Sequence, residues 1–262
     1  EADVWRGFVS GKRLYAHEVG TGKTLTMAAL AIESRRLRLA NKPVLFAHNA
    51  NSQAVYREAQ EAYPGAKILY VDNLDSKNKG QAMASIATED WDLIVIPHSL
   101  VDKLKMRPET LEKLLQEQMD QLEAAALEAF NEDDSPFKGR MPENLDNIDD
   151  DDLKKLKQRT AKELVKERLR LRERIREAQA DSASESTIFI EDMGIDMLMV
   201  DEAHIFKKIP IATRQQVKGL NKQSSNIGNS LMLLSDYIRG TQNGRGVFLF
   251  TGTPVTNTLN EI

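Results

Sequence analysis

Short, uninterrupted apolar runs, each bounded by polar or turn residues, constrain the fold of this chain more than any other feature of its sequence. The runs lie at residues 14–16, 44–47, 68–71, 93–96, 197–200 and 247–250. A strand with one face in water alternates apolar and polar residues, whereas a continuous run is typical of a parallel strand buried on both faces. Because helical patterns separate several runs, the sequence predicts an α/β fold with a mainly parallel sheet.

Two of the helical patterns also predict which side chains are buried. Residues 24–39 are expected to form a helix, and the residues spaced to lie on its apolar side are Leu25, Ala28, Ala29, Ile32 and Leu39. In a later segment, the apolar residues with helical spacing are Leu231, Leu234, Tyr237 and Ile238. We expect this second group to belong to the core.

The alternation of strands and helices is interrupted between residues 103 and 187. Apolar residues with helical spacing form two seams there, Leu111, Leu115, Met119, Leu122 and Ala126 in the first, and Leu153, Leu156, Leu164, Leu171, Ile175 and Ala178 in the second. The sequence therefore predicts an antiparallel helical hairpin over 103–187, inserted between a first part (1–102) and a second part (188–262) of the α/β domain. Its acidic and basic stretches leave open a second interpretation, a merely solvated, charged helical segment.

Composition excludes several classes of protein. With 36 Lys and Arg against 40 Asp and Glu, the net charge is −4, so any nucleic acid must meet a local patch and not a basic molecule as a whole. The absence of cysteine excludes disulfides, thiol nucleophiles and Cys-ligated zinc, and suits a reducing cytoplasm. No apolar run reaches the roughly 18 residues of a membrane span, so no membrane partner is expected. Because the chain begins with Glu1 and not with Met, we expect a piece of a longer protein.

The segment Gly20-Thr21-Gly22-Lys23-Thr24 follows the first apolar run and precedes a predicted helix. A phosphate-binding loop requires this order: glycines let backbone N–H groups approach the phosphates, the lysine supplies positive charge, and the hydroxyl holds Mg²⁺. Together with Val19, these residues are the candidate nucleotide-binding residues. The full pattern has a glycine where this chain has His17. The alternative is an ordinary glycine-rich turn.

The segment Asp201-Glu202-Ala203-His204 directly follows the buried run 197–200. An aspartate at the carboxyl end of a strand is placed to hold Mg²⁺, and the adjacent glutamate can polarise a water for attack on a γ-phosphate. Two carboxylates after four apolar residues are costly unless a cation meets them. Taken alone, the segment is also compatible with the acidic first turn of a helix.

The segment Thr251-Gly252-Thr253-Pro254 follows the last apolar run. Hydroxyls at the carboxyl end of a strand in an open α/β sheet point into the ligand crevice. In isolation the segment is compatible with a simple turn.

Taken in order, these three segments resemble motifs I, II and III of helicase superfamily 2. The chain is similar to the first, ATP-binding RecA-like lobe of an SNF2-like ATPase with a DEAH motif. The segment from His17 to Thr24 resembles the Asp-Glu-Met-Gly-Leu-Gly-Lys-Thr form common in SNF2 proteins, and His17 stands where the full phosphate-loop pattern has its first glycine. More narrowly, 15–24 and 200–208 resemble the helicase part of large helicase–methyltransferase polypeptides of phages and mobile elements.

The resemblance implies a RecA-like P-loop lobe that binds ATP and Mg²⁺. Lys23 would contact the phosphates, Thr24 and Asp201 would hold the metal, and Glu202 would activate water. The residues implied to couple nucleotide state to the grip on nucleic acid are His204, Thr251, Gly252 and Thr253.

The resemblance also implies partners and a compartment. These are duplex DNA, a second RecA-like lobe in the same parent polypeptide, and the cytoplasm of a bacterial or phage-infected cell. The implied function is a DNA-dependent ATPase that moves along or remodels DNA. Two alternatives stay open, a strand-separating helicase of the same superfamily and a catalytically weak scaffolding lobe.

Two segments are candidates for contact with nucleic acid. Asn51 and Ser52 stand where motif Ia of the resembled family contacts a DNA backbone, and an N-cap of the following helix is an equally good interpretation. A basic stretch begins with Lys207, Lys208 and Arg214, and a solvated loop is its alternative.

The histidines are not expected to bind a metal, because they are scattered at strand ends and have no cysteine partners. For His48 and His98 a role in lining the crevice or capping is favoured.

Overall fold

A computed structural model describes residues 1–18, 20–72, 78–116, 120, 169–176, 188–206 and 226–253. The chain divides into two compact units, of which the first comprises residues 1–106, 185–209 and 221–262 and the second comprises 107–184 and 210–220. The predicted domain roles of 1–102, 103–187 and 188–262 stay predictions.

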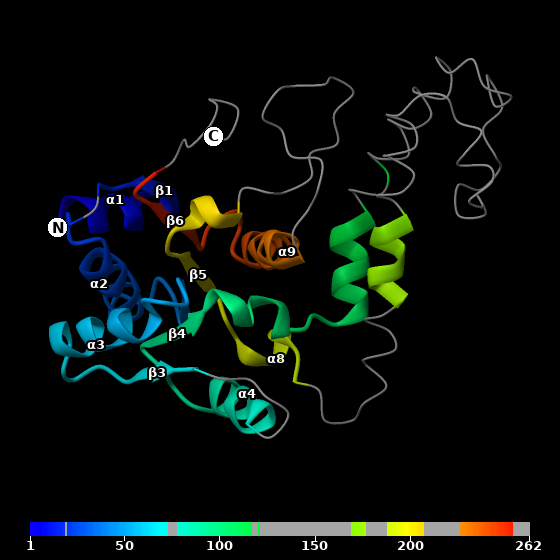
Figure 1. Cartoon of the computed structure of the whole chain (residues 1–262), viewed down its shortest axis with the longest axis horizontal. Coiled ribbons are helices and arrows are strands. Elements are labelled where there is room, and N and C mark those ends of the chain that lie inside the picture. Colours follow the sequence, from blue (N-terminus) through cyan, green and yellow to red (C-terminus); the bar gives the residue numbers. More distant parts are fainter. Residues whose placement is uncertain are drawn as a thin grey trace, which may run out of the picture. The chain divides into compact units, whose positions relative to one another are not determined.

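The first unit contains a parallel sheet of six strands (Figure 1). The strands are β1 (Lys12–Ala16), β2 (Pro43–Ala47), β3 (Ile68–Tyr70), β4 (Leu93–Pro97), β5 (Met197–Val200) and β6 (Val247–Thr251). Their order in the sheet is β1-β6-β5-β2-β4-β3, and each neighbouring pair is parallel. Each strand coincides with one of the apolar runs, so the predicted α/β fold with a parallel sheet, of the RecA-like type, is confirmed.

Helices cover both faces of this sheet (Figure 1). They are α1 (Ala2–Ser10), α2 (Lys23–Arg36), α3 (Ser52–Ala62), α4 (Lys79–Thr88), α8 (Ile190–Met193), α9 (Asn226–Thr241) and the 3₁₀ helices η1 (His98–Lys103) and η3 (Ala203–Phe206). Within the described ranges, no helix combines the length and the apolar character that crossing a membrane requires.

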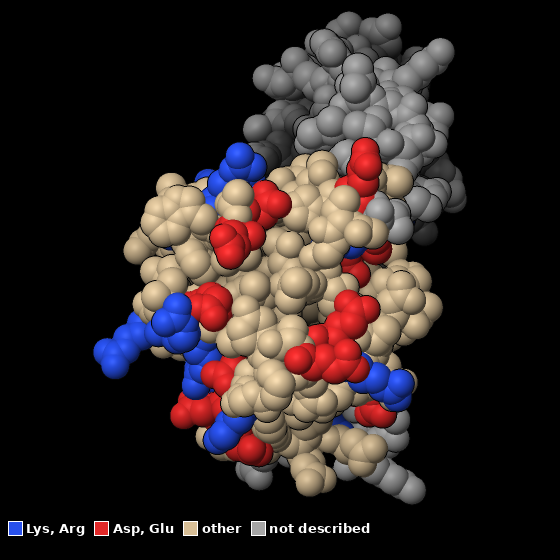
Figure 2. Space-filling model, turned by 90° about the vertical axis from the view of Figure 1, so that its left-hand side faces the viewer, with Lys and Arg blue, Asp and Glu red and all other residues tan. Residues whose placement is uncertain are grey.

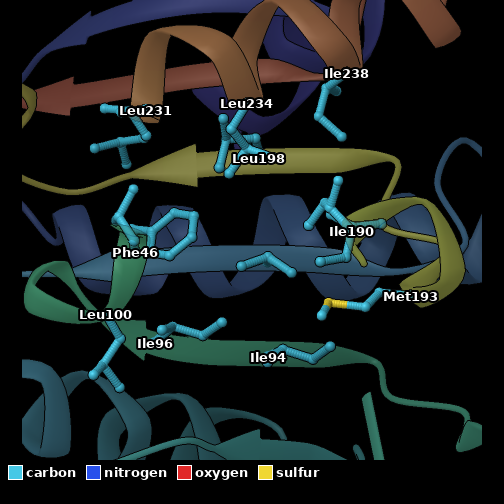
Figure 3. Packing of buried hydrophobic residues seen from close by; sticks show 14 of the residues in the cluster. Phe46, Ile94, Ile96, Leu100, Ile190, Met193, Leu198, Leu231, Leu234 and Ile238 are labelled. Carbon is cyan, nitrogen blue, oxygen red and sulfur yellow. The ribbon is translucent and has the colours of Figure 1, made fainter. Parts of the chain in front are cut away.

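Successive residues of the central strands alternate between two hydrophobic clusters, one on each face. In β4, Ile94 and Ile96 pack on the side of α8 and α9, whereas Leu93 and Val95 pack on the side of α2 and α3. Figure 3 shows the first cluster, in which Phe46 of β2 lies among side chains from β4, β5, α8 and α9. Because both faces are covered, these strands need apolar residues at every position, which explains the continuous runs.

The predicted burial of α2 is partly wrong. Ala28 and Ile32 are buried as expected, but Leu25 and Leu39 are exposed. The helix ends at Arg36, so Leu39 lies beyond it, and Leu25 is in the first turn beside the exposed glycine loop. The residues that α2 buries instead include Met27, Leu30 and Ala31. In α9 the expected Leu231, Leu234 and Ile238 are buried, and Tyr237 packs against their cluster.

Residues 108–116 and 169–176 of the second unit are helical. Leu111 and Leu115 of the first predicted seam and Leu171 and Ile175 of the second are buried. The remaining seam residues lie outside the described residues, and they are Met119, Leu122, Ala126, Leu153, Leu156, Leu164 and Ala178.

The first prediction compares a buried leucine of α2, Leu30, with an exposed one, Leu37, which is the C-cap residue of that helix. Leu30 is 0% exposed and Leu37 is 46% exposed. We expect Leu30→Ala to lower the free energy of unfolding by about 2–5 kcal/mol, because the cavity adds to the lost burial. Leu37→Ala should stay within about 0.5 kcal/mol of the parent protein. Urea unfolding of both variants measures the difference, and equal values would contradict the described packing of α2.

Candidate functional site

The parallel sheet brings the three sequence motifs to one edge. In a parallel sheet the carboxyl ends of all strands lie at the same edge, and here β1, β6 and β5 are consecutive neighbours. The three motifs follow these strands directly. The backbone N–H of His17 donates to the carbonyl of Thr251 over 3.0 Å, and that of Asp201 donates to the carbonyl of Phe46 on β2 over 2.8 Å. Segments far apart in the chain therefore form one site.

The glycine loop has the backbone that a phosphate-binding loop needs. Gly20 and Gly22 have φ values of 85° and 79°, in the left-handed region where a Cβ is strained. Space around both glycines is open, so backbone conformation and not crowding requires them. The turn is closed by Thr21, whose hydroxyl donates to the carbonyl of Glu18 over 2.8 Å. Gly22 is the N-cap of α2, so the loop leads into a helix N-terminus. Val19 lies outside the described residues.

Lys23 contacts both acids of the second motif. Its Nζ donates a hydrogen bond to Oε1 of Glu202 and lies 3.4 Å from Oδ1 of Asp201. The side chains of Lys23 and Asp201 are 14% and 7% exposed, so this ion pair is largely shielded from water. The cation that two carboxylates at the end of a buried strand require is therefore supplied by the glycine loop.

The pKa values of the two carboxylates are shifted in opposite directions. Burial raises the pKa of Asp201, and the charge of Lys23 opposes this effect. Burial also acts to raise the pKa of Glu202, but the hydrogen bond and the charge of Lys23 outweigh it, so the pKa of Glu202 is lowered. The charge of His204 and the N–H of Gly252 act in the same direction. Glu202 is thus the carboxylate held most firmly in its ionised form.

The backbone of Glu202 is strained in a way that the sequence does not reveal. Its φ is 47°, which is uncommon for a residue with a Cβ. The N–H of Glu202 donates to Oδ1 of Asp201 over 2.9 Å, and this bond helps to hold the conformation. Strain of this kind is found at sites where a side chain must point in one particular direction.

The predicted coupling residues also come together. Nδ1 of His204 lies 2.9 Å from Oγ1 of Thr251 and 3.2 Å from Oε2 of Glu202. The N–H of Thr253 donates to the same threonine oxygen over 3.1 Å. Thr251 is buried, so its hydroxyl joins His204 and Thr253 and is not turned toward open solvent. The end of β6 is thereby linked to Glu202 through one histidine.

The residues expected to hold Mg²⁺ have suitable chemistry. Asp201 offers a carboxylate and Thr24 a hydroxyl, and oxygen atoms are the ligands that Mg²⁺ prefers. Thr24 is adjacent to Lys23 in the first turn of α2, and Lys23 reaches Asp201. Within the described ranges, no group of three or more His, Asp or Glu side chains could hold a metal ion by itself. These two residues would therefore share the metal with phosphate oxygens and water.

The residues predicted to contact nucleic acid differ in their exposure and in their contacts. Ser52 is 1% exposed, and its hydroxyl donates to the carbonyl of Asn49 and lies 3.0 Å from the hydroxyl of Tyr70, so a contact through this hydroxyl is not available. Asn51 is exposed and occupies the N-cap position of α3 without a side-chain capping bond. The predicted N-cap position of Asn51 is thus confirmed, although its side chain makes no capping bond within the described residues. Lys207, Lys208 and Arg214 lie outside the described residues.

An open cavity of about 860 Å³ lies at the amino ends of the strands, lined among others by Arg35, Lys42 and Tyr63. Its position is opposite to the three motifs. Arg35 is paired with Asp92 over 2.8 Å, and Lys42 donates to the carbonyl of Ile86 over 2.6 Å. These two cations are therefore already engaged within the protein.

His98 is a residue at this edge whose importance the sequence only hints at. It follows β4, is 4% exposed, and packs edge-on against Phe206 of η3 with 4.6 Å between ring centroids. Within the part of the chain that the structure describes, neither ring nitrogen has a hydrogen-bond partner of good geometry. Burial lowers the pKa of His98 to about 4, although the carbonyl of Asp201 acts in the other direction. His98 therefore does not line an open crevice, as the sequence predicted. It packs beneath the second motif.

Comparison with known families gives one match. A family model described as a probable helicase domain matches residues 5–262. No curated protein matches the chain.

The second prediction concerns the pH dependence of stability. Below pH 6.5 the unfolded chain takes up a proton at His98, whereas the folded chain binds it only near pH 4. Protons therefore favour the unfolded state, and this residue should lower the free energy of unfolding by about 2 kcal/mol between pH 7 and pH 5. Urea unfolding at both pH values measures the loss. His98→Phe, which keeps an aromatic ring, should remove the share of this loss that comes from His98. An unchanged pH dependence in the variant would contradict the burial of a neutral His98.

Proposed function

The chain belongs to the probable helicase domain family, and from this premise we propose that it is the ATP-binding lobe of an SNF2-like ATPase that hydrolyses ATP with Mg²⁺ to move along or remodel duplex DNA. The observation that carries the proposal is the contact of Lys23 with Asp201 and Glu202. A lysine on a glycine loop and two carboxylates on a neighbouring strand are the parts that phosphoryl transfer to water requires.

The phosphate site is formed by the loop and the N-terminus of α2. Backbone N–H groups of residues 20–24 and the helix dipole favour negative charge there. Lys23 is shared between the carboxylates and the phosphates, and nucleotide binding draws its Nζ away from Glu202. Thr24 and Asp201 would hold Mg²⁺, which would supply positive charge to the phosphate oxygens.

Release of Lys23 leaves Glu202 free to orient water. Its strained backbone fixes the direction of the carboxylate, so it can accept a proton from a water in line with the γ-phosphate. Oε2 of Glu202 keeps its contact with His204, and His204 contacts Thr251. Binding or hydrolysis of the nucleotide therefore affects the end of β6 through these contacts. Gly252 and Thr253 follow directly in the chain.

Nucleic acid is proposed to bind along the carboxyl edge of the sheet, where the exposed Asn51 lies. The face formed by α1, α2 and α3 carries acidic and basic side chains interspersed with neutral ones (Figure 2). Such a mixed surface does not provide the single-sign field that binding to a phosphate backbone favours.

A second RecA-like lobe in the same parent polypeptide would complete the ATP site, and the cytoplasm is the proposed compartment.

Strand separation is the second candidate function, and the description of the matching family as a helicase favours it. The motifs are the same for both activities. A catalytically weak scaffolding lobe is less well supported, because such a lobe does not need the shielded contact between Lys23 and both carboxylates.

The third prediction tests the nucleotide site. We expect Lys23→Ala to weaken binding of Mg·ATP at least tenfold in a calorimetric titration of this chain, since a charge-assisted contact to phosphate is worth about 1.5–3 kcal/mol. Lys67→Ala removes an exposed lysine before β3 and serves as the matched control. Equal affinity of the two variants would remove Lys23 from the site, and no binding to the parent protein would overturn the proposed function.

The fourth prediction separates binding from turnover. Glu202→Gln keeps the size of the side chain but cannot accept the proton of water. We expect it to lower single-turnover ATP hydrolysis in the presence of duplex DNA by about 10²-fold or more, with affinity for Mg·ATP within about threefold of the parent. Glu58→Gln, on the exposed side of α3, is the control and should hydrolyse ATP normally. Unchanged hydrolysis in Glu202→Gln would exclude Glu202 as the group that activates water.

A further inference from the structure

His17 is the one departure of the loop from the glycine pattern, and its side chain points inward. Glu18, Gly20, Thr21 and Gly22 are exposed, so the described part of the loop is anchored to the protein at its two ends, by His17 and by Lys23. The side chain of His17 is 14% exposed. A loop held at both ends has fewer conformations to lose when a ligand binds.

The contacts of His17 connect the loop to α1. Its Nε2 lies 3.3 Å from Oδ2 of Asp3, in the first turn of that helix. The carbonyl of Asp3 also accepts a hydrogen bond of 2.8 Å from the hydroxyl of Tyr15, which stacks on Phe250 with 4.5 Å between ring centroids. The imidazole ring meets both aromatic rings edge-on. These contacts therefore connect three segments, namely the start of α1, the start of the loop and the end of β6.

The same residue is connected to the reacting groups. Its N–H donates to the carbonyl of Thr251, and the hydroxyl of Thr251 contacts His204, which contacts Glu202. The loop is thus tied to α1 through the side chain of His17 and to β6 through its backbone. A glycine at this position could make only the second connection.

We propose that Asp3 and His17 are positioning residues that hold the phosphate-binding loop against α1, so that α1 determines where the loop presents its N–H groups to the nucleotide. This inference rests on the proposed function. Simple packing does not account for His17, because its Nδ1 is buried without a partner among the described residues, and a phenylalanine would fill the same space without that cost.

Variants of His17 separate positioning from packing. His17→Phe keeps the ring and loses the contact with Asp3, whereas His17→Gln loses the ring and keeps an N–H donor at a similar reach. We expect His17→Phe and Asp3→Ala each to weaken Mg·ATP binding about tenfold, the size expected for one charge-assisted contact. The double variant should be no weaker than either single variant. His17→Gln should bind as the parent does.

The control is Arg6→Gln, which removes the ion pair of Asp3 with Arg6, at 3.6 Å, without touching the loop. It should leave nucleotide affinity unchanged. Thermal unfolding of every variant is measured alongside the calorimetric titration. Affinity losses in His17→Phe and Asp3→Ala that exceed any expected from their Tm, together with normal affinity in His17→Gln, support the proposal.

Parent-like affinity in His17→Phe, or additive losses in the double variant, would overturn it. Losses that follow Tm across all variants, Arg6→Gln included, would reduce the pair to a structural contact and would overturn it as well. The parent protein and Lys23→Ala decide the proposed function separately. If these two differ as expected while the variants of His17 and Asp3 do not, only the role of α1 fails.

Discussion

Two parallel strand pairings, β1 with β6 and β6 with β5, bring the three motifs of the candidate site together. The loop before α2, the acids after β5 and the threonines after β6 contact one another only because these strands are neighbours. Inside a sheet covered on both faces, the ends of the strands are where polar groups can gather. Lys23 then places one positive charge against both carboxylates beside a buried strand.

Much of the fold could be predicted from the sequence, because burial on both faces leaves a direct trace in the residue pattern. The continuous runs of β2, β4 and β5 identified the strands without any alternation to count. α2 shows where such reasoning fails. Its apolar residues surround much of the helix, so spacing alone selected Leu25 and Leu39, whereas contact with β2 and α3 selects Met27 and Leu30. Neighbours from other parts of the chain decide between such faces.

The candidate site was predictable in its residue types and not in its geometry. Glycines, lysine and acids at fixed spacing indicate phosphate chemistry, because few other functions need them in that order. The left-handed backbone of Glu202, the burial of Ser52 and the contact of His17 with Asp3 depend on tertiary neighbours that no local pattern encodes. His98 gives the faintest signal, a histidine directly after an apolar run, and only its burial under Phe206 distinguishes it.

The strand order also has a consequence for how the chain is made. Within the described sheet β1 stands at one end and has β6 as its sole partner, although the two are separated by most of the sequence. During synthesis, both edges of β1 therefore stay unpaired until residues 247–251 have left the ribosome. Long-range pairings of this kind slow folding and prolong the exposure of apolar strands. The phosphate-binding loop that follows β1 can therefore take its place beside the end of β6 only after β6 has been made.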